Sequence, residues 1–332
     1  MTEPFLRWAG GKRWLARRIY PFISSRLVKG GTYFEPFLGS GAMFFCVEPK
    51  KAFLSDLNED LITTYRQVKL CPKALVSRLA RMPSSRKVYE RVRSWAPKSK
   101  MERAVRFIYL NRNCYGGLYR ENQTGHFNVP FGGGERNHKG LCKDGRILSA
   151  SSALRVPNVE LRKCDFKETL ILAKNGDVVY CDPTYREVNR RQFDRYGKTL
   201  FTWEDQEHLS RMAIAAYRRG AVVIISNTTC DGIRDLYLEG GIIKIERPKG
   251  LGPRGRHRDL VEYLIVLDPS QEWSFWESLG RLLKPWRRMS VNFFSGLPRS
   301  PGFLGDCVKR SSLKKVKSKQ GAHSSRSRIC SD

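Results

Sequence analysis

The stretch Tyr33-Phe34-Glu35-Pro36-Phe37-Leu38-Gly39-Ser40-Gly41 decides the fold class of this chain. Its first five residues predict a short strand, its two glycines predict a tight turn, and residues 42–47 predict a helix. Small residues at a strand-to-helix turn let a bound cofactor approach the backbone closely. The stretch therefore predicts an α/β fold with a ligand site at this turn.

The rest of the chain continues the alternation of strands and helices, which predicts a mainly parallel sheet. Residues 60–110 are instead helical and basic, and residues 111–145 are rich in Gly, Asn and aromatic residues, which predicts loops with a hairpin. We therefore expect a smaller lobe inserted at about 60–150. The expected elements are helices at 13–25, 42–47 and 204–219, and strands at 33–37, 52–56, 159–161, 177–181, 221–225 and 261–267.

The composition argues against several classes of protein. The chain has 332 residues, 41% of them hydrophobic, which suffices for one large domain and a smaller one. It has no run of 18 apolar residues, and residues 1–4 lack the layout of a secretory signal, so we expect a cytoplasmic protein. Nine cysteines without a CxxC pair and five scattered histidines predict neither a disulfide framework nor a metal site.

The charge is the first indication of a partner. Residues 269–332 contribute +9 to the formal net charge of +29, so residues 1–268 carry +20. A basic body of this kind favours a polyanion such as nucleic acid, although a solvated basic surface is the plainer alternative. Residues from about 309 onward are rich in Lys, Ser and Arg and are expected to be disordered.

Asp56 ends the second predicted strand, 17 residues after Gly39. In nucleotide-binding folds an acid at this place accepts hydrogen bonds from ribose hydroxyls. The alternative is that Asp56 caps the helix that starts near Asn58. The glycine turn and the acid together favour an adenosine-containing cofactor. They leave NAD and S-adenosylmethionine open, although the absence of a GxGxxG turn weakens the case for NAD.

A second motif, Val178-Val179-Tyr180-Cys181-Asp182-Pro183-Thr184-Tyr185, places an acid and a proline at the end of an apolar strand. An Asp-Pro turn beside an aromatic residue is the ordinary explanation. At the carboxyl edge of a sheet, however, Asp182 and the Pro183 carbonyl can accept both hydrogens of an exocyclic amino group, while Tyr185 stacks on a flipped base. Adenine N6 needs such acceptors because its lone pair is delocalised into the ring, so positioning supplies most of the rate.

These two motifs, with several others in the same order, resemble the Dam-type (D12 class) DNA adenine-N6 methyltransferases over residues 5–268. The resemblance implies a Rossmann-like sheet of the S-adenosylmethionine-dependent methyltransferase type, with an inserted helical lobe that recognises DNA. The further matching stretches are Phe5-Leu6-Arg7-Trp8-Ala9-Gly10-Gly11-Lys12, Asp56-Leu57-Asn58-Glu59-Asp60-Leu61-Ile62, Tyr109-Leu110-Asn111-Arg112, Gly125-His126-Phe127-Asn128-Val129-Pro130-Phe131-Gly132 and Ser226-Asn227.

The resemblance also implies a reaction and the residues that serve it. S-adenosylmethionine is the implied methyl donor and double-stranded DNA the implied substrate, methylated at GATC by a monomer without a metal, in DNA marking or in restriction-modification. The implied catalytic residues are Asp182, Pro183 and Tyr185; the cofactor contacts are Trp8, Lys12, Phe37, Gly39, Asp56 and Asp182; the DNA contacts are Arg7, Tyr115, Arg120, Asn128 and Pro130.

Two residues depart from the family pattern. Thr184 replaces the usual proline of the catalytic motif, and Gly116 stands where GATC readers often have an asparagine. A catalytically impaired DNA-binding relative is therefore the alternative function. An RNA substrate is less favoured, because the major groove of A-form RNA is too narrow for an inserted hairpin. A nicotinamide dehydrogenase explains neither the charge nor the Asp182 motif.

The sequence also predicts how the chain is divided. We expect residues 1–60 and 150–268 to form the catalytic, cofactor-binding domain. Residues 61–149 are the expected DNA-recognition lobe, and residues 269–332 are a basic extension, partly disordered.

Overall fold

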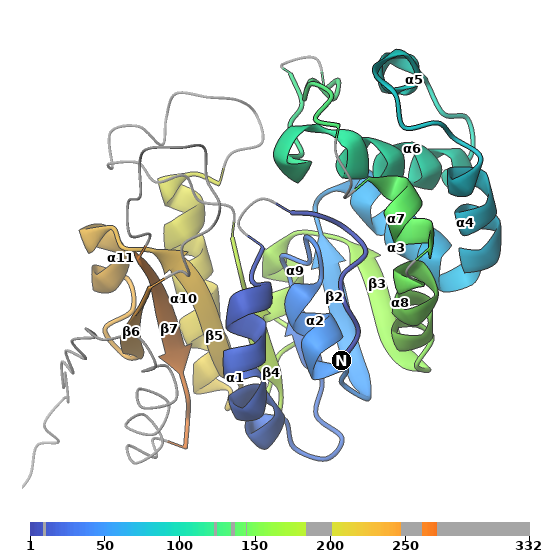
Figure 1. The fold of residues 1–332 in the computed structure, drawn as a ribbon. Helices are drawn as coiled ribbons and strands as arrows, with labels where there is room; N and C mark the ends of the chain where they lie inside the picture. The colour runs from blue at the N-terminus through green and yellow to red at the C-terminus, as the bar shows by residue number, and fades with distance from the viewer. Residues whose placement is uncertain are drawn as a thin grey trace, which may run out of the picture. The chain divides into compact units, whose positions relative to one another are not determined.

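The centre of the fold is a seven-stranded sheet with the strand order β3-β2-β1-β4-β5-β7-β6 (Figure 1). The computed structural model describes residues 1–8, 11–122, 125–133, 137–143, 145–183, 201–246 and 261–270. All neighbouring strands pair in parallel except β7, which runs antiparallel to β5 and β6. This confirms the predicted α/β class. The strands are β1 (Tyr33–Glu35), β2 (Lys51–Asp56), β3 (Asn158–Lys163), β4 (Val178–Cys181), β5 (Val222–Thr228), β6 (Gly241–Glu246) and β7 (Val261–Leu267).

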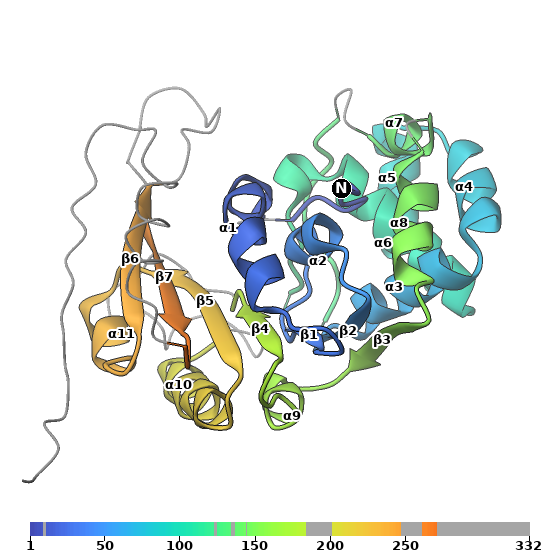
Figure 2. The ribbon, with the colours of Figure 1, turned by 90° about the horizontal axis from the view of Figure 1, so that it is seen from below.

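Helices cover both faces of this sheet (Figure 2). Successive strand residues point to opposite faces, so Tyr33 and Phe34 of β1 belong to two different hydrophobic clusters. The Tyr33 face is buried under α1 and α2, and the Phe34 face under α9, α10 and α11. Burial on both faces explains why the central strands are continuous apolar runs. The covering helices are α1 (Arg13–Arg26), α2 (Ala42–Val47), α9 (Phe166–Leu170), α10 (Trp203–Arg218) and α11 (Asp231–Asp235).

A helical lobe lies beside β3, and α3 connects the two. Arg66 of α3 donates to the Leu161 carbonyl at 3.0 Å, and Lys69 donates to the Val159 carbonyl at 2.6 Å. These bonds satisfy carbonyls of β3, an outer strand of the sheet, and so protect its open edge. The lobe is built from α3 (Glu59–Leu70), α4 (Pro72–Ala80), α5 (Arg86–Ser94), α6 (Lys100–Asn113), α7 (His138–Lys143) and α8 (Arg146–Leu154).

The main differences from the predicted elements lie where polar residues are buried. α6 continues to Asn113, past the expected end near residue 110, and α7 replaces part of the expected loops. Asn113 and His138 are fully buried and their side-chain nitrogens lie 2.8 Å apart. Residues that look like loop residues are thus held inside by partners distant in sequence. β6, α9 and α11 were not predicted either; Lys244 interrupts the apolar pattern of β6.

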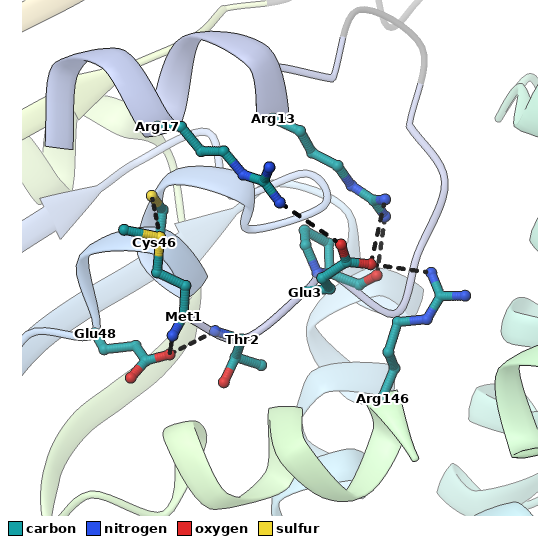
Figure 3. A network of polar contacts seen from close by, with 9 residues as sticks. Met1, Thr2, Glu3, Arg13, Arg17, Cys46, Glu48 and Arg146 are labelled. Atoms are coloured by element: carbon teal, nitrogen blue, oxygen red, sulfur yellow. Dashed lines mark hydrogen bonds and ion pairs between the residues drawn. The ribbon is translucent and has the colours of Figure 1, made fainter. Parts of the chain in front are cut away.

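The N-terminal segment is fixed along α1 and α8 by exposed ion pairs (Figure 3). Glu3 lies between Arg13 at 4.0 Å, Arg17 at 3.8 Å and Arg146 at 3.7 Å. We call these four residues the Glu3 cluster. Arg13 also donates to the Pro4 carbonyl at 3.0 Å. The segment leads from this cluster to Arg7 and Trp8, two of the predicted site residues.

Candidate active site

The glycine turn and the Asp182 motif lie side by side because β1 and β4 are neighbours. The two strands pair in parallel, with Tyr33 opposite Val178 and Phe34 opposite Val179. After β1 the chain crosses to β2 on one side, whereas β5 follows β4 on the other. Such a reversal of strand order opens a crevice at the carboxyl edge of the sheet, and this is where α/β proteins bind ligands.

Glu35, the buried last residue of β1, hydrogen-bonds to the helix that follows the glycine turn. Its carboxyl group accepts hydrogen bonds from the Tyr33 hydroxyl at 2.9 Å and from the backbone N–H of Phe44 at 3.0 Å. Burial raises the pKa of Glu35 to about 8; the two hydrogen bonds oppose this, and the Asp182 and Asp56 carboxylates add to it. Glu35 thus fixes the start of α2 largely as an uncharged acid.

Gly39 allows the backbone of the glycine turn to lie close to the Trp8 side chain. Gly39 has a φ of +46°, and a Cβ atom there would lie 3.0 Å from the Trp8 indole nitrogen. Trp8 also stacks on Tyr119, with ring centroids 6.0 Å apart and an interplanar angle of 14°. The Trp8 indole therefore links the glycine turn to Tyr119, which belongs to the protein segment predicted to contact DNA.

Asp56 closes the turn from the end of β2. Its carboxylate accepts the backbone N–H of Gly39 at 3.1 Å and that of Asn58 at 3.0 Å. Burial raises the pKa of Asp56, and these hydrogen bonds oppose the rise. The helix cap is Asn58, whose side chain accepts from Leu61 N–H at 2.9 Å. Asp56 therefore holds the glycine turn, and the residue that caps α3 is Asn58 and not Asp56.

Asp182 follows β4 and takes part in a buried ion cluster. The Lys12 ammonium lies 3.1 Å from Asp182 Oδ1 and 3.2 Å from Glu262 Oε2. The side chain of Lys12 is 4% exposed, that of Glu262 9% and that of Asp182 23%. We call these three residues the Lys12 cluster. Asp182 is its most accessible member, so of the two carboxylates it is the one better placed to meet a ligand.

An aromatic surface lies on the other side of the glycine turn. Phe37 stacks on Phe166 at 5.5 Å between ring centroids and meets Phe201 edge-on at 5.5 Å. Phe37 and Phe201 remain partly exposed. A flat apolar face beside a carboxylate suits a purine with its ribose.

Four of the five predicted DNA-contacting residues lie on one hairpin-like segment, residues 115–131, and the fifth, Arg7, packs against it. Arg7 exchanges two hydrogen bonds with the Asn111 side chain, accepting at its carbonyl at 2.7 Å and donating from its N–H at 2.9 Å. A Cβ at Gly117 would lie 2.6 Å from Arg7 Cβ, so the hairpin rests directly on this residue. Arg7 thereby joins the segment 115–131 although it is more than a hundred residues away in sequence.

The two arms of the hairpin are tied by pairs of predicted residues. Arg120 Nε donates to Asn128 Oδ1 at 2.7 Å, and Tyr115 N–H donates to the Pro130 carbonyl at 2.9 Å. The Tyr115 side chain is 57% exposed. An exposed aromatic ring on a segment that also carries Arg120 is suited to contact nucleic acid.

Several predicted features lie outside the described residues. These are Thr184 and Tyr185 of the catalytic motif and the chain from residue 271 onward. Pro183 is described and buried directly after Asp182. In the described part of the chain no group of three His, Cys, Asp or Glu residues is suited to hold a metal ion. Within the same residues, no helix has the length and apolarity to cross a membrane.

Sequence reasoning missed Glu262, Glu35, Tyr119, Phe166 and Phe201 as residues of the site. Glu262 carried a signal, because an acid inside the apolar run 261–267 must have a partner when buried. Glu35 lies within the strand and glycine turn at 33–41, but its burial is a property of the folded sheet. The aromatic partners of Trp8 and Phe37 give no local signal, since their contacts are made between distant segments.

Comparison with known proteins shows the family to which the chain belongs. Residues 8–250 match the model of the D12 class N6 adenine-specific DNA methyltransferases. A type II methyltransferase of Lactococcus lactis, M1.LlaDCHI, is 34% identical over 273 residues, which cover 80% of this chain and 94% of the relative. The DNA adenine methylase of Escherichia coli K12 is 32% identical over 276 residues, which cover 80% and 95%. The chain belongs to the D12 class and is an adenine-specific DNA methyltransferase.

Proposed function

We propose that the chain transfers the methyl group of S-adenosylmethionine to N6 of a flipped adenine in duplex DNA, within the sequence GATC, and that it acts as a monomer. The observation that carries the proposal is the Lys12 cluster, which brings Asp182 to the crevice beside the glycine turn. In the same proposal, residues 1–60 and 150–268 form the catalytic, cofactor-binding domain, residues 61–149 form the DNA-recognition lobe, and residues 269–332 form a basic extension.

The residues around the turn fit a cationic adenosine cofactor. Gly39 and Gly41 lie where a Cβ would meet Trp8 or Tyr65 at about 3 Å, so the backbone itself lines the turn. Asp56 is set to accept ribose hydroxyls, and Phe37 offers a face for the purine. When bound, S-adenosylmethionine supplies a methyl group on a positively charged sulfur. Trp8 and Lys12 complete the proposed cofactor contacts.

Asp182 and Pro183 act on the target base. The Asp182 carboxylate and the Pro183 carbonyl accept the two N6 hydrogens, which favours a pyramidal nitrogen whose lone pair points at the methyl carbon. Positive charge develops on N6 as the bond forms, and the Asp182 carboxylate stabilises it. Tyr185 stacks on the flipped adenine. In the hairpin, Arg7, Tyr115, Arg120, Asn128 and Pro130 contact the DNA, with Arg120 suited to a guanine edge.

The test is methyl transfer from radiolabelled S-adenosylmethionine to two short duplexes, one with GATC and one with that site scrambled. We expect label in the GATC duplex alone. Label in both duplexes would keep the reaction and reject the GATC specificity, which would direct attention to Gly116. Label in neither, with DNA binding intact in a gel-shift assay, would favour a catalytically impaired DNA-binding relative, and Thr184→Pro would then be tested for restored transfer.

A further inference from the structure

Glu262 occupies a position that the proposed transfer does not yet explain. It is the second residue of β7, where it pairs with Thr228 of β5 and Ile245 of β6. Because β7 is antiparallel, its first residues lie at the carboxyl edge of the parallel strands. Pairing on both sides fixes the backbone of Glu262 at a place from which its carboxylate contacts the Lys12 ammonium.

The carboxylate of Glu262 changes the charge of the site. Lys12 and Asp182 alone would form a neutral pair, whereas Lys12 between two carboxylates gives the cluster a net charge of −1. Glu262 Oε2 lies 3.2 Å from the ammonium but accepts no hydrogen bond, so the contact is ionic. Glu35 at the same edge is largely protonated near neutral pH and does not supply a full charge, whereas the Asp56 carboxylate is held by the Gly39 and Asn58 N–H groups of the turn.

Stability alone does not account for an acid at this position. Asp182 already gives Lys12 a partner, and burying another carboxylate costs desolvation energy that one shared ammonium recovers only in part. The neighbouring residues Val261, Tyr263, Leu264 and Ile265 show that an apolar side chain fits the strand pattern. A charge retained in such a strand points to a role in the site.

We propose that Glu262 gives this site its preference for the methyl donor, which has a net charge of +1, over the demethylated product, which has no net charge. The inference rests on the proposed use of S-adenosylmethionine. In the transfer the N6 lone pair bonds the methyl carbon, the carbon–sulfur electron pair stays on sulfur, and N6 then releases a proton to solvent water. The cofactor therefore changes from a net charge of +1 to zero. A cluster of net charge −1 attracts the donor and has little hold on S-adenosylhomocysteine.

The test is the binding of both cofactors to the full chain by isothermal titration calorimetry, for the wild type and for Glu262→Gln. The amide keeps the shape of the side chain and removes its charge. We expect the Kd of S-adenosylmethionine to rise about tenfold, the order of effect of one unit charge in a partly screened site. The Kd of S-adenosylhomocysteine should change far less. Glu262→Asp, which keeps the charge, should retain most of the preference.

Controls separate this role from a structural one. Glu160→Gln, which removes an exposed carboxylate on β3, should leave both Kd values unchanged. The proposal would be overturned if Glu262→Gln left the ratio of the two Kd values, for S-adenosylmethionine and S-adenosylhomocysteine, unchanged, for example by raising both equally. If Glu262→Gln does not fold, Thr228→Lys serves instead, because Thr228 is the partly exposed residue of β5 that pairs with Glu262. The added positive charge should lower the preference for S-adenosylmethionine, and an unchanged ratio of the two Kd values would overturn the proposal. A wild type that binds neither cofactor would instead refute the proposed function.

Discussion

The Lys12 cluster and the Glu3 cluster have opposite composition and opposite surroundings. In the Lys12 cluster one cation lies between two carboxylates, its side chain 4% exposed, at distances of 3.1 and 3.2 Å. In the Glu3 cluster one carboxylate lies among three arginines at 3.7–4.0 Å, with exposures of 25–74% (Figure 3). Water screens the second cluster and is largely excluded from the first. We therefore expect the loss of a charge to cost far more in the first cluster than in the second.

The largest effect is expected when the buried cluster loses its cation. Lys12→Met leaves the Asp182 and Glu262 carboxylates facing each other with no counter-charge. We expect the free energy of unfolding to fall by about 3 kcal/mol, because breaking a buried ion pair leaves uncompensated charge. Urea unfolding measures this, with Lys163→Met on the exposed surface of β3 as the matched control. A loss no larger than that of the control would show that the cluster is not electrostatically buried.

The next effect is a pH dependence that comes from Glu35. Its folded pKa of about 8 lies above the unfolded value of about 4.5, so its stabilising contribution is complete below pH 4.5 and is lost as the pH rises towards 8. Glu35→Gln mimics the protonated acid and removes this dependence. Between pH 6 and 8 the wild type should lose about 2 kcal/mol more than the variant. Parallel stability curves for the two proteins would contradict the buried, protonated state of Glu35.

A smaller loss of stability than that of Lys12→Met is expected at Asn111, which is buried but uncharged. Asn111→Ala removes both hydrogen bonds to the Arg7 backbone and should cost about 1–2 kcal/mol of stability. Because Arg7 lies under the hairpin, the variant should also discriminate less well between the GATC and scrambled duplexes. Gel-shift titration of both duplexes measures this. Unchanged discrimination would mean that the position of Arg7 does not contribute to recognition.

The smallest effect is expected in the Glu3 cluster. Glu3→Ala should change the free energy of unfolding by no more than about 0.5 kcal/mol, since exposed ion pairs contribute little and the three arginines stay solvated. Urea unfolding at low salt checks this. A cost near that of Lys12→Met would erase the difference between the two clusters and would show that solvent exposure is a poor guide to their strength.

The fold could be predicted largely from the sequence because its signals are local. The apolar runs of β4, β5 and β7 and the glycine turn after β1 are each written in consecutive residues. The adjacency of β1 and β4 then brings Gly39 and Asp182 to one edge, as expected for an α/β sheet. β6 escaped prediction because Lys244 breaks its apolar pattern, and its place depends on pairing with β7.

The site could be predicted only in part because its contacts join distant segments. Lys12 and Asp182 were singled out from their motifs, but the second carboxylate that contacts Lys12, Glu262, comes from a strand 250 residues after Lys12. Tyr119 becomes a neighbour of Trp8 only when the lobe packs on the N-terminal segment. The raised pKa of Glu35 follows from burial, which no motif records. Motifs name the residues that meet ligands, whereas packing decides which residues support them.

The central claim is that Asp182 carries the transfer. The most direct measurement compares methyl transfer from radiolabelled S-adenosylmethionine to a GATC duplex by the wild type, by Asp182→Ala and by Asp235→Ala, which alters an exposed aspartate of α11. We expect Asp182→Ala to lose transfer at least about 100-fold, the scale of removing one charge-stabilising group, while its DNA binding in a gel shift is largely retained. Asp235→Ala should match the wild type. Transfer at the wild-type rate by Asp182→Ala would contradict the account.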